Sequence, residues 1–485
     1  MVRVLAVLHV LSVVILMFAL CLLFPLAWSL LLGDAAQAAY DEAILLTVSS
    51  GMLLWATTRK HRRELQPRDG FLLVALVYTV LPAFATLPLL FYLPELSFTD
   101  AYFEAVSGLT ASGGTVLTGL DALPPSINIW RTFLIWLGGM GVIVLAVAIL
   151  PLLGVGGSQM YKAETPGPMK DTKLTPRIAE TAKGLWLVYF MITVAALLAY
   201  RVAGMNWLDA MMHAFTTMGL GGFSSHDASY AYWNSPAIEV VAIYFMLLAG
   251  INFGTHFLAW RRWSFGPYAR DPEAWLYLLV VLGSVLGIAY FLFANQTYDN
   301  FWTALRFSAF NVVSIATTTG YSNTDYNLWP IFAPVWMLLL CTFATCSGST
   351  GGGIKMIRAR LMASQAVREM TRIIHPRAVV PVKLAGVPVE NNIIFAILAF
   401  ILVYNGAVIS MTMLLAASGL DIVSAFSAVI ASINNTGPGL NRVGPAATYA
   451  SLNDFQTWVC TVAMLLGRLE LFTLLVVLTP GFWRK

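Results

Sequence analysis

The sequence has little charge for its length. Only 11% of its 485 residues are Asp, Glu, Lys or Arg, whereas 59% belong to the hydrophobic set. Soluble globular proteins carry about 25% charged residues, so a water-soluble fold of this size is excluded. Runs of about 20 apolar residues match the roughly 30 Å hydrocarbon core of a bilayer. The sequence therefore predicts an all-α protein that crosses a membrane many times.

Cysteine and histidine are also scarce. The four cysteines, Cys21, Cys341, Cys346 and Cys460, lie in apolar segments without zinc-type spacing. We expect them to be buried small side chains rather than disulfides. The six histidines form no H-E-x-x-H motif, and no convincing catalytic Ser or paired Asp motif is present. These absences disfavour an intramembrane enzyme, and we expect neither an organic cofactor nor a nucleic-acid partner.

Hydropathy predicts ten spanning helices. They cover residues 4–32, 39–58, 70–93, 129–155, 184–204, 236–260, 274–295, 331–360, 391–417 and 455–480. The first run is too long for the core of a secretory signal and lacks a clear small-residue cleavage site. We therefore interpret it as a span.

Lysine and arginine gather on one side of the predicted membrane. They follow the second, fourth, sixth and eighth spans and stand at both ends of the chain, and the largest cluster covers residues 355–383. The positive-inside rule assigns this side to the cytoplasm, here that of a bacterial inner membrane. The opposite side is acidic, which would raise the cation concentration at an outer mouth. Ordinary topology bias is the alternative explanation, although it accounts for the basic side alone.

Four stretches between spans are too apolar for exposed loops and too short to cross. Each ends in small, glycine-bearing residues: TASGGT (110–115), GLGGFS (219–224), TTTGYS (317–322) and NNTGPG (434–439). They align on Gly113, Gly222, Gly320 and Gly437. This self-similarity indicates an internal fourfold repeat. It divides the chain into two N-terminal helices (1–69) and pore repeats over 70–160, 161–265, 266–375 and 376–485.

The repeated stretch predicts an ion-binding site. A short helix that dips into the membrane and returns as irregular backbone is tolerated only where protein or a water-filled cavity satisfies that backbone. Four such returns around one axis would form rings of carbonyl oxygens that replace the hydration shell of an ion, and glycine permits the positive φ this needs. Taken singly, each stretch could instead be a re-entrant turn with an ordinary glycine cap. The predicted ion ligands are Thr110, Ala111, Ser112, Gly113, Leu220, Gly221, Gly222, Thr318, Thr319, Gly320, Asn435, Thr436 and Gly437.

The helix that follows each stretch has a glycine near its middle: Gly138–Gly139, Gly250, Gly348 and Gly467. In the third repeat the segment CSGSTGGGIK (346–355) places four glycines inside a span, and each interior glycine costs about 1 kcal/mol relative to alanine. We expect this helix to be broken by a loop under the four stretches. The segment loosely suggests a phosphate-binding loop, but Ile354 separates Gly353 from Lys355, so nucleotide binding is not expected.

The last span contains an arginine. Arg468 and Glu470 interrupt a run that is otherwise apolar from Trp458 to Leu478. A buried arginine usually faces an interior cavity or a partner. A structural ion pair, with Glu470 or with another chain, is the alternative, although residues two apart do not share a helix face. We expect Glu470 to serve the structure or a dimer interface.

With these features the sequence resembles the Trk/Ktr/HKT superfamily of potassium uptake proteins over nearly its whole length. The resemblance implies two extra helices and then four covalently linked repeats of outer helix, pore helix, filter and inner helix around one pore. Potassium channels have the fuller TVGYG sequence, whereas this family keeps one glycine per repeat, as here. The resemblance therefore implies a potassium-type filter with a less uniform lining and leaves Na⁺ discrimination open.

The resemblance also implies roles and partners. The loop of the third inner helix would partly plug the pore and move in gating, and Arg468 would raise a barrier to cations; the loop residues are Cys346, Ser347, Gly348, Ser349, Thr350, Gly351, Gly352 and Gly353. Family members form homodimers and bind a cytosolic TrkA-type ring that senses nucleotides. The basic 355–383 surface is the docking candidate, but anionic membrane lipid would explain the same charges. A secondary symporter coupled to H⁺ or Na⁺ is the alternative to channel-like conduction, with Glu470 as its one strong intramembrane carboxylate.

Overall fold

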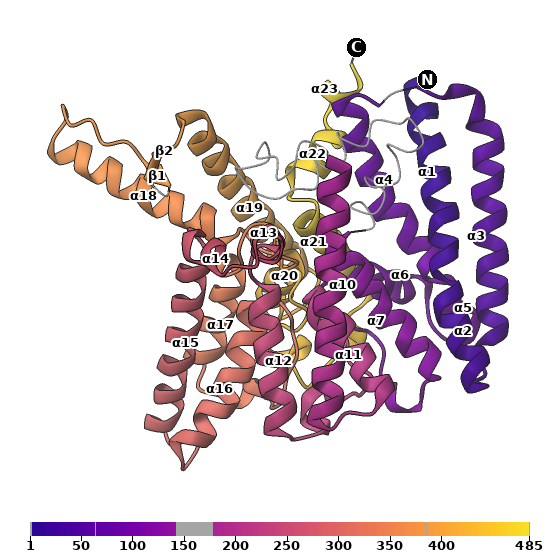
Figure 1. Ribbon diagram of the computed structural model, residues 1–485, viewed down its shortest axis with the longest axis horizontal. Coiled ribbons are helices and arrows are strands. Elements are labelled where there is room, and N and C mark those ends of the chain that lie inside the picture. The colour runs from indigo at the N-terminus through magenta and orange to yellow at the C-terminus, as the bar shows by residue number, and fades with distance from the viewer. Residues whose placement is uncertain (1, 64, 142–177, 385, 485) are drawn as a thin grey trace.

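The computed structural model describes residues 2–63, 65–141, 178–384 and 386–484, and helices dominate it (Figure 1). Within these ranges the sheet content is one short hairpin, β1 (Lys383–Leu384) with β2 (Val387–Pro388). The predicted all-α fold is confirmed.

Three helices precede the repeated part of the chain. α1 (Val2–Cys21) and α2 (Leu23–Leu32) together form an apolar run long enough to cross a membrane, and α3 (Gln37–Thr58) returns along α1. The chain reverses at Gly33, whose φ of 64° caps α2 in the left-handed region. These helices stand at one edge of the molecule (Figure 1).

The same order of elements then occurs four times. A long outer helix comes first: α4 (Pro67–Ala85) with α5 (Leu87–Tyr92), α10 (Ile178–Ala203), α15 (Ala274–Ala294) and α19 (Asn391–Ala417). A short helix follows: α6 (Phe98–Leu109), α11 (Trp207–Gly219), α16 (Phe301–Ala316) and α20 (Ile422–Ile433). An inner helix closes each unit: α7 (Pro125–Met140), α12 (Pro236–Ala249) with α13 (Phe253–Arg262), α17 (Phe332–Phe343) with α18 (Met356–Ile374), and α21 (Asp454–Arg468) with α22 (Phe472–Leu478). Among the described residues the remaining α-helices are the short α14 (Gly266–Arg270) and α23 (Pro480–Trp483).

The helices agree with most of the predicted spans. Among the described residues, five helical runs are long and apolar enough to cross a membrane: Val4–Leu32, Arg68–Tyr92, Ala182–Ala203, Ala274–Ala294 and Asn391–Ala417. Two bent pairs bring the number to seven. Of the other three predicted spans, 39–58 is the helix α3 and 331–360 divides into α17 and α18. The span 129–155 begins in α7 and continues beyond the described residues. Four of the basic residues that follow this predicted span, Lys162, Lys170, Lys173 and Arg177, also lie outside the described residues.

Two of the inner helices depart from the sequence prediction. Residues 236–260 and 455–480 were each expected to form one continuous span. Instead α12 meets α13 at 92°, and α21 meets α22 at 111°. The second bend follows from Glu470 and Leu471, which have φ values of 53° and 50° and so cannot continue a right-handed helix.

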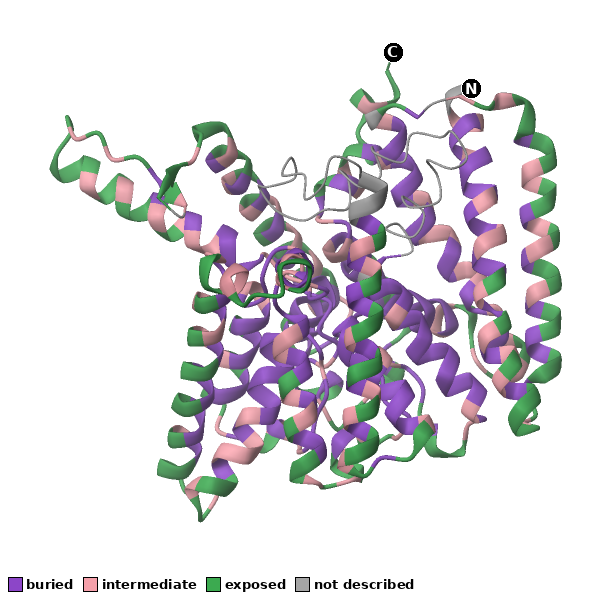
Figure 2. Cartoon of the chain, in the orientation of Figure 1, coloured by how far each residue is buried: buried purple, intermediate pink, exposed green. Residues whose placement is uncertain are grey.

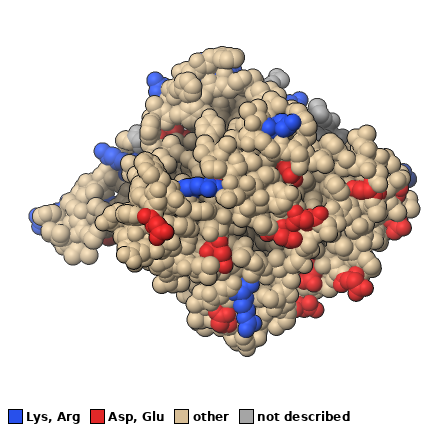
Figure 3. Space-filling view, turned by 90° about the horizontal axis from the view of Figure 1, so that it is seen from below, with Lys and Arg blue, Asp and Glu red and all other residues tan. Residues whose placement is uncertain are grey.

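Burial follows the pattern of a membrane protein. The short helices are mostly buried, whereas the outer helices expose large apolar side chains such as Leu279, Leu286 and Leu402 (Figure 2). In water such a surface would be costly, so it is expected to face lipid. Both termini and α18 lie at the top of Figure 1. The opposite face, seen from below in Figure 3, gathers Asp and Glu around its centre, as predicted for the outer side.

Candidate ion-binding site

The four short helices end in the same turn. The residue two before each aligned glycine has a left-handed backbone: Ala111 (φ 53°), Leu220 (53°), Thr318 (60°) and Asn435 (54°). The amide of the next residue bonds to the carbonyl five residues earlier, in the pairs Ser112–Ser107 (2.8 Å), Gly221–Thr216 (3.0 Å), Thr319–Ser314 (2.8 Å) and Thr436–Ala431 (2.8 Å). This is a Schellman cap formed four times. It redirects the chain from each short helix into the loop that contains the glycine.

The left-handed position is strained in all four turns. Such a cap usually carries glycine, and a side chain there costs roughly 1–2 kcal/mol. All four side chains are buried. Strain of this kind persists where the surrounding structure enforces it, and it clusters at functional sites. Sequence analysis placed these four residues among the predicted ion ligands but did not foresee their common left-handed backbone, because Ala, Leu, Thr and Asn share no chemical signature.

The four aligned glycines come together in a closed ring. A Cβ atom added to Gly113 would lie within 3.0 Å of the Gly222 backbone, and one added to Gly222 would lie within 3.0 Å of Gly320. A Cβ atom on Gly320 would overlap the Thr436 carbonyl, and one on Gly437 would overlap Gly113. Each loop thus touches the next in chain order, and the last touches the first. There is no room for a side chain at any of the four positions.

Positive φ accounts for three of the four glycines. Gly113, Gly320 and Gly437 have φ values of 81°, 90° and 96°. Gly222 is not in this region, so close backbone approach alone requires glycine there. The predicted alignment of the four glycines is therefore present in the structure. Left-handed backbone favours glycine at three positions, and close approach of the next loop requires it at Gly222.

Polar side chains in the loops bind one another. The hydroxyl groups of Thr110 and Ser112 lie 2.9 Å apart, and those of Thr317 and Thr319 lie 2.7 Å apart. The Asn435 amide crosses to Ser112 Oγ at 2.7 Å. These bonds lock the loops to each other and occupy several of their side-chain polar groups.

One predicted ligand has a competing partner. The Tyr449 hydroxyl donates to the Gly437 carbonyl oxygen at 2.7 Å, and the Tyr449 amide donates to Thr115 O at 2.9 Å. Tyr449 therefore ties the fourth loop to the first. Sequence analysis did not single it out, because it lies 12 residues beyond the glycine whose carbonyl it binds.

A buried ion pair supports the first loop. Arg131 and Glu104 approach to 2.7 Å, and each side chain is 1% exposed. Glu104 also accepts the Thr115 hydroxyl and the Val116 amide, both at 3.0 Å. The Arg131 guanidinium lies 4.5 Å from the centre of the Phe223 ring in the second loop. The Arg131–Glu104 pair therefore holds Thr115 and Val116 of the first loop against Phe223 of the second loop. Sequence analysis did not assign this role.

A cavity of about 240 Å³ opens beside the ring. Its lining includes Gly113, Gly222, Gly320 and Pro438 of the loops together with His226 and Asp227. His226 contacts Asp121, and its Nε2 lies 3.3 Å from Asp209 Oδ2. Burial lowers the pKa of His226, but hydrogen bonds and charge from Asp209 and Asp121 outweigh it and raise that pKa above the ordinary value. His226 in the cavity lining therefore lies between two carboxylates, and Asp227 adds a third carboxylate to the lining.

The third inner helix is broken where the glycine-rich segment predicted it. α17 ends at Phe343 and α18 begins at Met356. Residues 346–353 are called the gate segment from here on, after the role predicted for them. They lie against the ends of the short helices that carry the ring. The Gly352 amide donates to Thr318 Oγ1 at 2.8 Å, and the Thr350 hydroxyl donates to Met218 O at 2.9 Å. A Cβ atom on Gly352 would also overlap the Asn434 carbonyl. The segment thus touches the ends of three short helices.

Arg468 binds carbonyl groups. Its guanidinium donates to Thr350 O and Gly139 O, each at 3.1 Å, and also to Gly138 O. It therefore links the gate segment to the first inner helix. Glu470, the alternative partner named from sequence, accepts from Arg358 at 2.8 Å and so has an ionic partner other than Arg468. α21 ends at Arg468, so the spacing argument based on a continuous helix does not apply.

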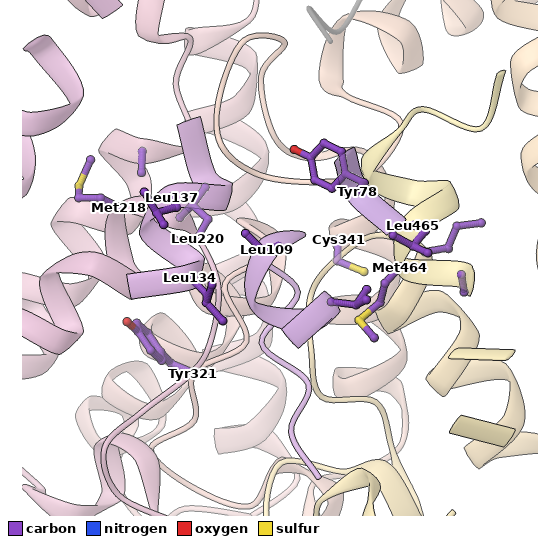
Figure 4. Close-up of a cluster of buried hydrophobic side chains, with 14 of the residues drawn as sticks. Tyr78, Leu109, Leu134, Leu137, Met218, Leu220, Tyr321, Cys341, Met464 and Leu465 are labelled. Carbon is purple, nitrogen blue, oxygen red and sulfur yellow. The ribbon is translucent and has the colours of Figure 1, made fainter. Parts of the chain in front are cut away.

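The mid-helix glycines let the inner helices reach the ends of the short helices. A Cβ atom on Gly138 would overlap the Leu109 carbonyl, one on Gly139 would lie within 3.0 Å of Gly219, and one on Gly467 would overlap the Ile433 carbonyl. Apolar side chains fill the remaining space, among them Leu109, Leu134, Leu220, Tyr321 and Met464 (Figure 4). Cys341, Cys346 and Cys460 are buried free thiols and Cys21 is partly buried, as predicted.

Comparison with known proteins identifies relatives over the full length. The TrkH family profile, described as a cation transport protein, matches residues 37–482. The chain is 46% identical over 480 residues to the Trk system potassium uptake protein TrkH of Halomonas elongata and 43% identical over 481 residues to that of Escherichia coli K12, with 99% of each chain covered. The crystal structure of the potassium transporter TrkH from Vibrio parahaemolyticus superposes with a TM-score of 0.89 at 40% identity, covering 99% of both chains.

Proposed function

Because this chain belongs to the TrkH family of cation transport proteins, we propose that it carries K⁺ through a gated, channel-like pore at the ring of four glycines. The chain is a multi-pass protein of the inner membrane and a transporter rather than an enzyme. The relatives are named potassium uptake proteins, which supports K⁺ as the transported ion.

The observation that carries the proposal is the closed contact between the four loops. Each glycine lies against the backbone of the next loop, from Gly113 through Gly222 and Gly320 to Gly437. Four backbones at such distances can present carbonyl oxygens to one ion and replace its hydration shell. We assign the ion ligands to the loop residues predicted from sequence, with repeats 70–160, 161–265, 266–375 and 376–485 each supplying one loop.

The gate segment and Arg468 form the proposed barrier. The segment lies under the ring and is bound to three short helices. Arg468 holds its Thr350 carbonyl and places a permanent positive charge below the ring. Conduction then requires the segment to leave these partners.

Coupled symport is the less favoured mechanism. A proton-coupled pathway needs a carboxylate that can exchange protons within the membrane. Glu470, the candidate named from sequence, is ion-paired with Arg358 at 2.8 Å. The Glu470 carboxylate is thus engaged in a contact between two helices, which favours a structural role and passive conduction.

The proposed partners act at the cytoplasmic side. We propose a homodimer that binds a cytosolic nucleotide-sensing ring of TrkA type. The basic 355–383 surface supports this, since it includes α18, which projects from the body of the protein (Figure 1). Arg368 and Arg372 on this helix would serve equally to hold anionic lipid.

Uptake of ⁸⁶Rb⁺ into proteoliposomes, with Na⁺ and Li⁺ as competitors, tests the function. We expect K⁺ to compete strongly and the two smaller cations weakly. A current that reverses at the potassium Nernst potential, whatever the proton or sodium gradient, supports a channel. A reversal potential that moves with either gradient would establish symport instead.

A further inference from the structure

A buried carboxylate binds both ends of the gate region. Glu273, which is 4% exposed, precedes the span Ala274–Ala294. Its carboxylate accepts the Ser347 amide at 3.1 and 3.2 Å and the Ile357 amide at 2.8 Å. Ser347 lies at the start of the gate segment, and Ile357 lies in the first turn of α18. The Glu273 side chain thus links the start of the gate segment to the start of α18.

The turn that holds Glu273 also contacts both cytoplasmic half-helices. The Asp271 carboxylate accepts the Thr255 hydroxyl of α13 at 2.6 Å. The Pro272 carbonyl accepts from Arg360 of α18 at 2.7 Å. The second halves of two broken inner helices therefore meet at residues 271–273.

Main-chain bonds add a direct connection between the two breaks. The Cys346 amide donates to Gly250 O at 3.1 Å, and the Phe253 amide donates to Gly348 O at 3.0 Å. A displacement of α13 is therefore transmitted to the gate segment through its backbone. A displacement of α18 is transmitted through Glu273.

We propose that Glu273 is the positioning residue of the gate, whose carboxylate holds the gate segment under the ring and releases it when α18 moves. The proposal rests on the pore function proposed above and adds its regulation. Hydrogen bonds to an ionised acceptor are about twice as strong as neutral ones, so the charged form of Glu273 holds the segment best.

The surroundings of Glu273 make its charge sensitive to pH. Burial raises its pKa to about 7, although the amides of Ser347 and Ile357 and the charge of Lys355 oppose this shift. Asp271 acts in the same direction as burial, and Cys346 and Lys355 are further titratable groups that interact with Glu273. Above that pH the carboxylate is ionised and the segment is held. As the pH falls through this value, protonation weakens both bonds.

Rb⁺ flux per folded protein, measured at about pH 8 and about pH 6, tests the proposal. For the wild type we expect flux to rise about three- to tenfold as the pH falls. Glu273→Gln should already show the raised flux at about pH 8 and should respond little to pH. Glu273→Asp keeps the charge but shortens the reach, so its flux at about pH 8 should lie between the two. Glu390→Gln is the matched control, because Glu390 is exposed at the same place before the next outer helix α19.

The outcomes are distinguishable. A wild type without Rb⁺ flux at either pH contradicts the pore function itself. A conducting wild type combined with a Glu273→Gln variant of equal flux and equal pH response overturns the role of Glu273 alone. If neither Glu273 variant is monodisperse, the test rests on the Rb⁺ flux of the wild type at the two pH values. Equal wild-type flux at both pH values rejects the proposal.

Discussion

Arg468 Nη1 donates a hydrogen bond of 3.1 Å to the carbonyl oxygen of Thr350, a residue 118 positions earlier in the chain. The bond joins the end of α21 to the gate segment. The same guanidinium reaches Gly139 O in the first inner helix at 3.1 Å. Arg468 thus places a fixed charge beside the gate segment and ties that segment to the first inner helix.

Arg468→Ala should increase Rb⁺ flux. Two unit charges 6 Å apart interact by roughly 3 kcal/mol at an effective dielectric of about 20. Binding of the guanidinium to three carbonyls offsets part of this repulsion, so we expect an increase of about tenfold. Arg468→Lys keeps the charge and should change the flux much less. Flux is measured per folded protein, with Arg442→Ala, an arginine with a 60% exposed side chain, as the control. An Arg468→Ala variant that conducts no faster would show that the arginine is structural.

Deletion of several residues between Gly348 and Gly353 should raise flux several-fold and preserve the preference for Rb⁺ over Na⁺. In the proposed mechanism the segment obstructs the ion pathway, whereas selectivity is assigned to the four loops. Uptake with Na⁺ competition reports both properties. Loss of flux in a correctly folded deletion variant would mean that the segment is a structural or docking element.

Glu104→Gln should destabilise the protein strongly. It leaves Arg131 buried without its charged partner, and breaking a buried pair from one side costs about 3–5 kcal/mol. Glu239→Gln removes a pair whose arginine is 28% exposed, so it should cost less. Thermal unfolding in detergent compares the two variants. The double variant Glu104→Gln/Arg131→Met should recover much of the loss, and equal melting temperatures for all variants would contradict the assignment.

The outer loops should lose stability as the pH rises. The pKa of His226 is raised in the folded protein, mainly because hydrogen bonds to Asp209 and Asp121 overcome the opposing effect of burial. The folded state therefore holds this proton more tightly than the unfolded chain. The contribution is fully present below the unfolded pKa of about 6.5 and disappears as the pH rises through the raised value. Melting temperatures of the wild type and His226→Gln should converge at alkaline pH, and a constant difference between them would rule out this titration.

The glycine register and the break in the third inner helix were predictable from the sequence, because both depend on residue types that occur at regular positions. Gly113, Gly320 and Gly437 lie in left-handed conformations, and the segment 346–355 is too rich in glycine for a stable helix. These features are local, except at Gly222, where the approach of the neighbouring loop requires glycine. They require no knowledge of what lies across the fold.

The bends in the second and fourth inner helices were not predictable in the same way. Leu471 adopts a φ of 50°, which its residue type disfavours and which only the packing around it enforces. The partners of Glu104, Glu273 and Tyr449 were equally hidden. Glu273 lies 74 residues from Ser347, and no periodic pattern in the sequence marks such a pair.

Selectivity of Gly320→Ser tests the central claim, the ring of four loops, most directly. A side chain at Gly320 would overlap the Thr436 carbonyl and disturb the carbonyl positions. Gly33→Ser is the matched control, since Gly33 has a φ of 64° but open space around it. The measurement is ⁸⁶Rb⁺ uptake into proteoliposomes with Na⁺ and Li⁺ as competitors, and Gly113→Ser serves as a second ring variant. The account predicts that both ring variants admit Na⁺ or Li⁺ more readily while Gly33→Ser behaves as the wild type. Unchanged competition in both ring variants would contradict it.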